Sequence, residues 1–155
     1  MRISLSRGLD SGPGELDVEL FEYSLDWLLE AHRRYGEPVF SLICLRLSNM
    51  PQVAAALGEA QGQALVDSLL VRFVDSVRAA DRCTQTGDDT LWLLLPYTDG
   101  EARMKVEQRL RRLSDLFEDQ SPAIGLQVGG VTAPMDLRMH EDAGILMERV
   151  ASRLS

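Results

Sequence analysis

The side chains with the greatest chemical potential lie close together in the middle of the chain. Asp88 and Asp89 follow Gly87 and precede the apolar run Leu91–Leu95, so two carboxylates stand beside a predicted buried strand. Carboxylate oxygens are the ligands that hard divalent cations prefer, which makes this pair a candidate metal site. Asp and Gly are also ordinary turn residues, and the same positions equally predict a plain hairpin turn.

A basic and an acidic residue stand just before this turn. Arg78 and Asp81 are three positions apart, a spacing that would place them on one face of a helix. The simplest interpretation is an exposed ion pair, worth about a few tenths of a kcal/mol. Further arginines lie nearby in the sequence, however, and a local arginine cluster can hold a small anionic ligand.

The apolar periodicity predicts the elements that would position these residues. Their order is helix, strand, helix, helix, strand, strand, helix, strand, helix. The predicted helices span residues 16–35, 52–57, 60–80, 99–117 and 141–154, and the predicted strands span residues 39–47, 82–86, 91–95 and 124–132. Arg78 and Asp81 thus fall at the end of the third helix, before the hairpin that carries Gly87 and the two aspartates.

This order predicts an α/β (α+β) sandwich of ferredoxin-like type, with an extra N-terminal helix. The helices are expected to cover both faces of the central sheet or to pack mainly on one. Residues 1–15 contain Ser-Gly-Pro-Gly and are predicted to be a flexible leader or linker. Residues 16–155 are predicted to form a single domain.

Composition limits the classes of partner. The 155 residues, 45% of them hydrophobic and 26% charged, are typical of a soluble globular protein. The net charge of −8 argues against a broad surface for nucleic acid or an anionic membrane. No apolar run is long enough to cross a membrane, and no secretory signal is visible, so no direct membrane insertion is expected. Cys44 and Cys83 are predicted to be buried thiols in a reduced, cytoplasmic setting.

Taken together, the spacing of several motifs resembles the GGDEF, or diguanylate cyclase, domain over roughly residues 39–150. Phe40–Pro51 is similar to that family's first strand and its Asp-x-Asp-x-Phe-Lys turn. Gly58–Leu65 resembles its Gly-His-x-x-Gly-Asp-x-Leu helix start. Gly-Asp-Asp-Thr-Leu at positions 87–91 stands where Gly-Gly-Asp-Glu-Phe would stand, and Arg78-x-x-Asp81 where the family has its inhibitory site. The resemblance implies a nucleotidyl-cyclase-type central sheet flanked by helices.

The departures from the family pattern imply a lost active site. The metal-binding Asp that ends the first strand is Arg46 here, and the Glu that helps to activate the 3′-hydroxyl is Thr90. The second signature glycine is Asp88, which leaves Asp89 as the acidic residue at a metal-ligating position. An arginine puts a fixed positive charge beside the metal's place. We therefore expect no bound Mg²⁺, no other cofactor and no catalytic residue.

The substrate-binding positions of the family have changed as well. Its guanine-holding Asn and Asp fall on Ala54 and Gln63, and the lysine of its turn falls on Pro51. The resemblance therefore predicts a domain without cyclase activity. A weakly active diguanylate cyclase, or an enzyme of altered specificity, is kept as a lesser alternative.

The inhibitory-type site keeps both of its residues. An arginine fork can donate to the O6 and N7 edge of guanine or to a phosphate, and an aspartate can accept from guanine N1 and N2. The family adds a second arginine, which the register places at Arg109, with Arg111 and Arg112 as alternatives. Arg82 could contribute too. The competing interpretation of the helix arginines is a solvated face balanced by nearby acids.

These residues predict a non-catalytic receptor of cyclic di-GMP. In that family, stacked cyclic di-GMP molecules often bridge two arginine-bearing surfaces, so binding would alter a protein partner or another domain of the same pathway. The alternative is a ligand-independent dimerisation or docking module, either a homodimer or a complex with another protein. Its contact would be the predicted N-terminal helix.

For five other residues the sequence predicts a structural role only. His32 and His140 lack metal-ligand spacing and are predicted to lie at the surface. Trp27 and Trp92 are predicted to be core or interface residues. Arg149 falls near a phosphate-binding lysine of the family but is predicted to be a plain arginine on a helix surface.

Overall fold

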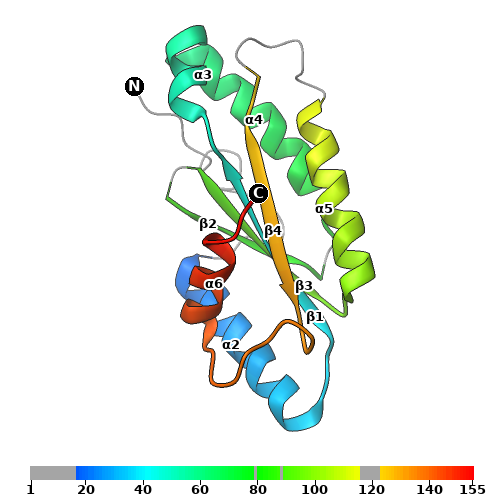
Figure 1. Cartoon of the computed structure of the whole chain (residues 1–155). Coiled ribbons are helices and arrows are strands. Elements are labelled where there is room, and N and C mark those ends of the chain that lie inside the picture. The colour runs from blue at the N-terminus through cyan, green and yellow to red at the C-terminus, as the bar shows by residue number, and fades with distance from the viewer. Residues whose placement is uncertain (1–16, 79, 88, 116–122) are drawn as a thin grey trace.

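The computed structural model describes residues 17–78, 80–87, 89–115 and 123–155. The predicted leader at residues 1–15 and Asp88 lie outside the described residues. The described part contains the predicted elements in the predicted order (Figure 1). The helices are α2 (Val18–Tyr35), α3 (Met50–Leu57), α4 (Glu59–Asp75), α5 (Gly100–Asp115) and α6 (Ala143–Ala151), and the strands are β1 (Phe40–Leu47), β2 (Arg82–Thr86), β3 (Thr90–Pro96) and β4 (Leu126–Thr132).

The four strands form one antiparallel sheet in the order β2-β3-β1-β4. The helical connections let β1 and β2 run in the same direction with β3 between them, which is the ferredoxin-like arrangement that the element order predicts. The register aligns Arg46 of β1 with Thr90 of β3 at one end of the sheet. At the other end, Ser41 of β1 aligns with Thr132 of β4.

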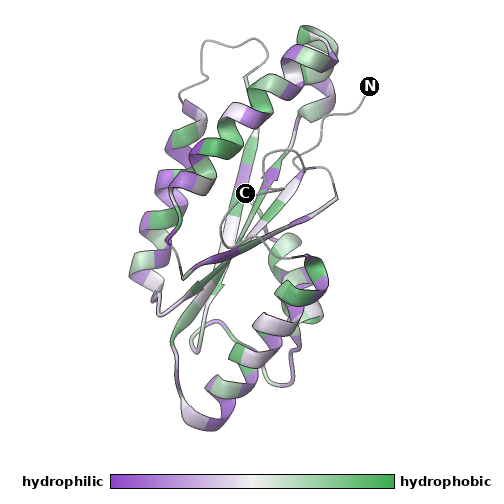
Figure 2. Ribbon diagram, turned by 180° about the vertical axis from the view of Figure 1, so that it is seen from behind, coloured by the Kyte–Doolittle hydropathy of each residue, from purple (hydrophilic) through white to green (hydrophobic). Residues whose placement is uncertain are grey.

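Helices cover both faces of the sheet, because β1 is apolar on both sides. Ile43, Leu45 and Leu47 face the cluster that α3, α4 and α5 complete, and Leu42 and Cys44 face the cluster that α2 and α6 complete. Such a near-continuous apolar run is typical of a strand that is buried on both faces. Figure 2 shows the same pattern, with hydrophobic residues along the strands and hydrophilic stretches on the outer faces of the helices.

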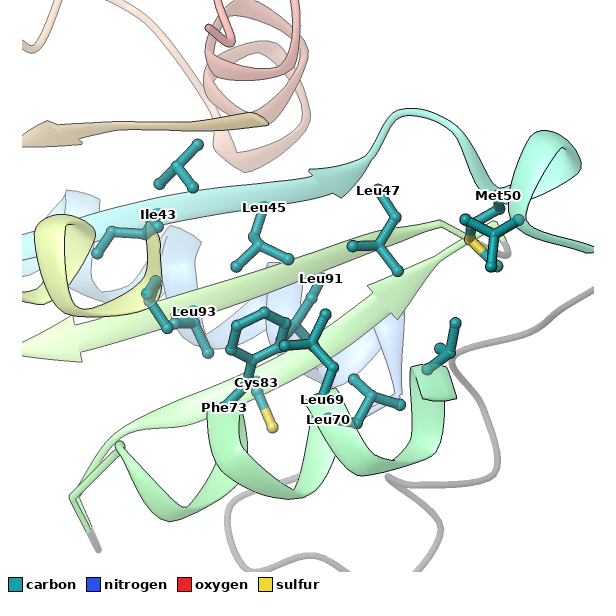
Figure 3. Close-up of a cluster of buried hydrophobic side chains, with 14 of the residues drawn as sticks. Ile43, Leu45, Leu47, Met50, Leu69, Leu70, Phe73, Cys83, Leu91 and Leu93 are labelled. Atoms are coloured by element: carbon teal, nitrogen blue, oxygen red, sulfur yellow. The ribbon is translucent and has the colours of Figure 1, made fainter. Parts of the chain in front are cut away.

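The larger core joins α4 to the hairpin. Leu69 and Phe73 of α4 lie against Leu91 and Leu93 of β3, and all four side chains are almost fully buried (Figure 3). Burying a side chain of this size contributes about 1.5–3 kcal/mol. This packing fixes the hairpin relative to α4, and therefore fixes the segment that joins α4 to β2.

Helix α2 packs on the opposite face and begins and ends as its sequence predicts. The side chain of Asp17 accepts a hydrogen bond from the Leu20 backbone at 2.8 Å, and Gly36 ends the helix with φ 71°. His32, predicted to lie at the surface, is buried instead, and its Nδ1 lies 3.1 Å from the Pro38 carbonyl oxygen. The prediction was wrong because the last turn of α2 packs under the start of β1.

Helix α4 ends at Asp75, earlier than the predicted residue 80. The backbone N–H and the hydroxyl of Ser76 both bond the Phe73 carbonyl, at 3.1 and 2.7 Å, which tightens the last turn. Arg78 and Asp81 therefore lie in the turn between α4 and β2. The sequence had predicted that they lie on one face of a helix, and that prediction was wrong. None of the described helices has the length and apolar character that a membrane span requires.

Candidate functional site

The segment between α4 and β2 is closed by the side chain of Asp81, which is only 4% exposed. One carboxylate oxygen accepts from the Arg78 backbone N–H at 2.8 Å, and the other accepts from the Arg78 guanidinium at 3.2 Å. A carboxylate that accepts a backbone N–H in this way replaces the hydrogen bond that a further helical turn would have made. Asp81 thus shapes the turn and anchors the arginine.

Two groups from the other side of the hairpin also hold Arg78. Its Nη2 donates to the Pro96 carbonyl at 3.0 Å and to the Thr98 hydroxyl at 2.7 Å. The side chain is nevertheless 58% exposed, and its Nη1 has no hydrogen-bond partner among the described residues. Arg78 is therefore held in one position while part of its guanidinium stays open to solvent. We call Arg78, Asp81, Arg82, Pro96 and Thr98 the hairpin base.

Arg82 is the first residue of β2 and aligns with Leu94 of β3. Leu94 belongs to the core on the α2 side of the sheet, so Arg82 lies on that side too. Its Nη1 donates to the Asp81 carbonyl at 3.0 Å. Arg78 and Arg82 are thus joined through Asp81, with Arg82 turned toward α2.

The arginines of α5 differ in their surroundings. Arg111 donates to the carbonyls of Val128 and Ser155, at 3.1 and 2.9 Å, and is therefore engaged with β4 and the chain end. Arg109 is exposed and lies about 200° around the helix axis from Arg111. Its neighbours at i−3 and i+4, Val106 and Leu113, pack against the core that α4 shares. Arg109 thus flanks the α4 side of α5, whereas the exposed Arg112 lies on the solvent side.

At its opposite end the hairpin turns at Gly87, whose φ of 68° is the left-handed conformation that glycine adopts without strain. We call Thr86, Gly87, Asp89 and Thr90 the hairpin tip. The Gly87 carbonyl accepts from the Gln85 side chain at 2.6 Å, which supports the turn. The turn that the sequence predicts is present.

The hairpin tip contacts Arg46 at the end of β1. Arg46 Nε lies 3.4 Å from the Thr90 hydroxyl, and that hydroxyl donates to the Asp89 carboxylate at 2.8 Å. The Asp89 carbonyl also accepts from the Leu47 backbone at 2.9 Å. The acid is therefore already engaged by its own neighbour and lies in the field of a fixed positive charge.

The thiol of Cys44 in β1 lies in the interior of the protein near this tip. Burial raises the pKa of Cys44 from 9.0 to about 12; the positive charge of Arg46 opposes this rise and the negative charge of Asp89 adds to it. The side chain is 0% exposed. The β1 segment next to the tip is thus closed to water, and both cysteines are buried thiols outside any disulfide, as predicted.

The side chains at the two positions expected to hold guanine in an active cyclase are buried. Ala54 is 2% exposed and belongs to the core. Gln63 is also buried, and its side-chain amide donates to Asp67 at 2.9 Å within α4. Neither side chain presents a free polar group for a purine at this end of the sheet.

Comparison with known proteins decides the family. The family model described as diguanylate cyclase, GGDEF domain, matches residues 18–154. The chain belongs to the GGDEF domain family. No curated protein sequence matches this GGDEF domain.

Solved structures of other GGDEF proteins share the fold. The GGDEF domain of YfiN (TpbB) from Pseudomonas aeruginosa is 17% identical with a TM-score of 0.74, over 92% of this chain and 87% of that one. DgcB from Caulobacter crescentus, in complex with c-di-GMP, is 13% identical with a TM-score of 0.72, over 88% of this chain and 81% of that one. The diguanylate cyclase SiaD from P. aeruginosa, in complex with its activator SiaC, is 20% identical with a TM-score of 0.73; the match covers 92% of this chain but only 55% of SiaD.

The Mg²⁺ that cyclases of this family use does not fit the residues of this GGDEF domain. A magnesium site needs oxygen ligands in near-octahedral geometry, commonly from carboxylates. The end of β1 offers the Arg46 guanidinium, and β3 offers the Thr90 hydroxyl, which is bonded to Asp89. Among the residues that the structure describes, no group of three His, Cys, Asp or Glu side chains could hold a metal ion.

Two further residues stand apart from their sequence interpretation. Arg149, predicted to be a surface residue, is only 12% exposed, and its Nε and Nη2 both bond Glu141 at 2.7 Å. Hydrogen bonding from Arg149 lowers the pKa of the Glu141 carboxyl, so this is a structural ion pair. Sequence reasoning missed Thr98 as a holder of Arg78, because nothing local to Thr98 indicates a contact with a residue 20 positions away.

Proposed function

We propose that this GGDEF domain is a non-catalytic receptor that binds cyclic di-GMP at the hairpin base. The observation that carries the proposal is the state of Arg78, which Asp81, Pro96 and Thr98 hold in place while it stays 58% exposed. A guanidinium that is already fixed loses less conformational entropy when a ligand arrives. The altered hairpin tip, with Arg46 beside Thr90, is the complementary reason to expect binding without turnover.

The chemistry assigns a role to each residue. Arg78 donates to the O6 and N7 edge of one guanine or to a phosphate. Asp81 holds that arginine and supplies negative charge beside it, and its buried oxygens already accept from Arg78. Arg109, on the α4 side of α5, is the second arginine of the proposal, with Arg82 on the α2 side and Arg112 as a more distant alternative.

Relatives support the choice of ligand and the existence of a protein partner. DgcB and another microbial GGDEF domain have been solved with cyclic di-GMP, and SiaD has been solved with a protein activator. For this chain, a cyclic di-GMP-dependent contact with a protein or another domain follows as part of the proposal.

Isothermal titration with cyclic di-GMP tests the receptor directly. Wild-type protein should bind in the micromolar range or tighter, and Arg78→Ala should lose at least about tenfold in affinity, because a hydrogen bond to a charged group contributes about 1.5–3 kcal/mol. Arg46→Ala, which removes an arginine at the opposite end of the hairpin, is the matched control. Absence of wild-type binding at tens of micromolar would reject the proposal.

A cyclase assay tests the second half of the proposal. Protein incubated with millimolar GTP and Mg²⁺ or Mn²⁺ should form no cyclic di-GMP, because the hairpin tip lacks a fitting set of metal ligands. Detection of product that scales with protein concentration would identify a weakly active cyclase instead.

A ligand-independent docking module is the second candidate, and one observation favours it. Leu20, Tyr23, Trp27 and Tyr35 of α2 are between 53% and 76% exposed, which is unusual for large apolar side chains on one helix. In this case the protein would form a homodimer or bind another protein equally well with Arg78→Ala and without cyclic di-GMP. Light scattering on size-exclusion fractions, with and without the ligand, separates the two candidates.

A further inference from the structure

A groove runs between α2 and the hairpin on the α2 side of the sheet. Its volume is about 430 Å³, within the range of small-molecule sites. The residues that line it come from α2, from the segment before β2 and from both strands of the hairpin: Tyr23, Ser24, Trp27, Leu28, Ala80, Arg82, Leu94 and Pro96.

One wall of this α2 groove is aromatic. Tyr23 and Trp27 are four residues apart and therefore lie on the same face of α2. They are 71% and 62% exposed, so their rings are accessible. Buried Leu28 and Leu94 supply an apolar floor. An accessible pair of aromatic rings over an apolar floor, with the Arg82 guanidinium on the other wall, fits a flat heterocycle that carries negative charge nearby.

The α2 groove begins where the hairpin base ends. Arg82 lines the groove and donates to the Asp81 carbonyl at 3.0 Å. Pro96 also lines the groove, and its carbonyl accepts from Arg78 at 3.0 Å. Arg82 and Pro96 thus connect the lining of the groove to the residues of the hairpin base.

We propose that the α2 groove binds one guanine base of cyclic di-GMP, stacked on Trp27 and Tyr23, while the rest of the ligand engages Arg78. The inference rests on the receptor function proposed above and extends it to residues of α2. A cyclic dinucleotide carries two flat bases on one ring of two phosphates, so a single molecule can reach both sites. Base–aromatic stacking is favourable for any base because it uses the face of the ring, and Arg82 adds a charge for the adjacent phosphate.

This arrangement couples the ligand to a helix that can report on it. Helix α2 contacts both β2 and α6 and presents Tyr23 and Trp27 to solvent. A base placed in the α2 groove covers these rings and changes the surface that α2 offers to a partner. The ligand would then act on that surface by covering it, with no movement of the sheet.

Calorimetry on the full chain tests the contact. Trp27→Ala should weaken cyclic di-GMP binding on the order of 5- to 100-fold, the range expected for the loss of one stacked base. Trp27→Phe should restore most of the affinity because it keeps an aromatic face. Tyr35→Ala is the matched control, since Tyr35 is 76% exposed on the same helix but does not line the groove.

Fluorescence provides a test that needs no loss of affinity. The chain has two tryptophans, and the second, Trp92, is 3% exposed and donates to the Thr86 hydroxyl at 2.9 Å. Cyclic di-GMP should quench the emission of wild-type protein through Trp27. In Trp27→Phe, where emission comes from Trp92, the ligand should leave the signal unchanged after correction for absorbance.

The outcomes separate the two proposals. If the wild type binds, Arg78→Ala does not, and Trp27→Ala and Tyr35→Ala both bind like the wild type, the groove is rejected and the receptor function stands. Quenching that persists in Trp27→Phe likewise rejects the groove. If the wild type does not bind at all, the receptor function fails and the groove fails with it.

Discussion

An arginine, an aspartate and a threonine meet at each end of the β2–β3 hairpin, but their contacts differ between the two ends. At the tip, Arg46 reaches the Thr90 hydroxyl at 3.4 Å, and that hydroxyl stands between the arginine and Asp89. At the base, Arg78 bonds its aspartate directly at 3.2 Å and its threonine, Thr98, at 2.7 Å. At the base the arginine therefore bonds both the aspartate and the threonine directly, whereas at the tip the threonine lies between the arginine and the aspartate.

We propose that this difference reflects the loss of one site and the retention of another. The arginine at the tip stands where the family resemblance implies a ligand carboxylate, whereas the arginine at the base is oriented by a carboxylate that is 4% exposed. A buried carboxylate requires a partner, because an unpaired charge in the interior is costly. We therefore expect the Arg78–Asp81 pair to contribute to the stability of the fold, which would also preserve the ligand site that we propose.

Arg78→Ala at the base has the largest expected effect, and Arg46→Ala at the tip is the variant with which it is compared. Arg78→Ala should lower the affinity for cyclic di-GMP about 10- to 100-fold, since it removes hydrogen bonds between a fixed guanidinium and the ligand. Arg46→Ala should leave the affinity within about twofold, because Arg46 lies at the opposite end of the hairpin. Both are measured by isothermal titration.

Circular dichroism of each variant controls for folding in this pair. Equal losses in the two variants would mean that the ligand does not distinguish the ends of the hairpin. A loss confined to Arg46→Ala would move the binding site to the tip and remove the comparison.

The two aspartates should differ in their contribution to stability. Asp81→Ala leaves the Arg78 backbone N–H without its acceptor and removes a buried partner of the guanidinium, so we expect a loss of about 2 kcal/mol in the free energy of unfolding. Asp89→Ala removes one hydrogen bond from the Thr90 side chain and should cost about 1 kcal/mol or less. Urea denaturation measures the free energy of unfolding of both variants. Equal losses would show that the contacts of Asp81 at the base stabilise the fold no more than the contact of Asp89 at the tip.

The sequence predicted the architecture well for a physical reason. The apolar run in β1 is buried on both faces, and the hairpin is bounded by a glycine in a left-handed conformation; both are local signals. The family assignment followed from motif spacing along the same elements. Placing helices on both faces was one of two alternatives that the sequence left open.

The site was predicted less completely, because its contacts are not local. The residues from 76 to 80 contain no helix breaker, so periodicity extended α4 through Arg78, whereas Asp81 captures the Arg78 backbone and forms a turn. Thr98 reaches Arg78 across 20 positions, and Glu141 pairs with Arg149 across eight. Neither pairing leaves a pattern in the sequence near the residue concerned.

Arg109 and Arg112 of α5 allow a smaller test of the proposed ligand site. Arg109→Ala should weaken cyclic di-GMP binding about 3- to 10-fold, as expected for an exposed charge that contacts phosphate. Arg112→Ala should have no effect at moderate salt, because it lies on the solvent side of the same helix. Titration at two salt concentrations measures the electrostatic part, and the reverse order would assign the second arginine to Arg112.

The last expected effect concerns the β1 segment beside the tip, and it appears only at alkaline pH. Burial raises the pKa of the Cys44 thiol from 9.0 to about 12, so above pH 9 the unfolded chain loses this proton while the folded chain keeps it. The contribution of Cys44 is therefore fully present below pH 9 and is lost as the pH rises from 9 to 12. Between pH 7 and pH 10, wild-type protein should lose about 1.4 kcal/mol more stability than Cys44→Ala in urea denaturation. Parallel losses in the two proteins would mean that water reaches Cys44 and that the β1 segment beside the tip is not closed.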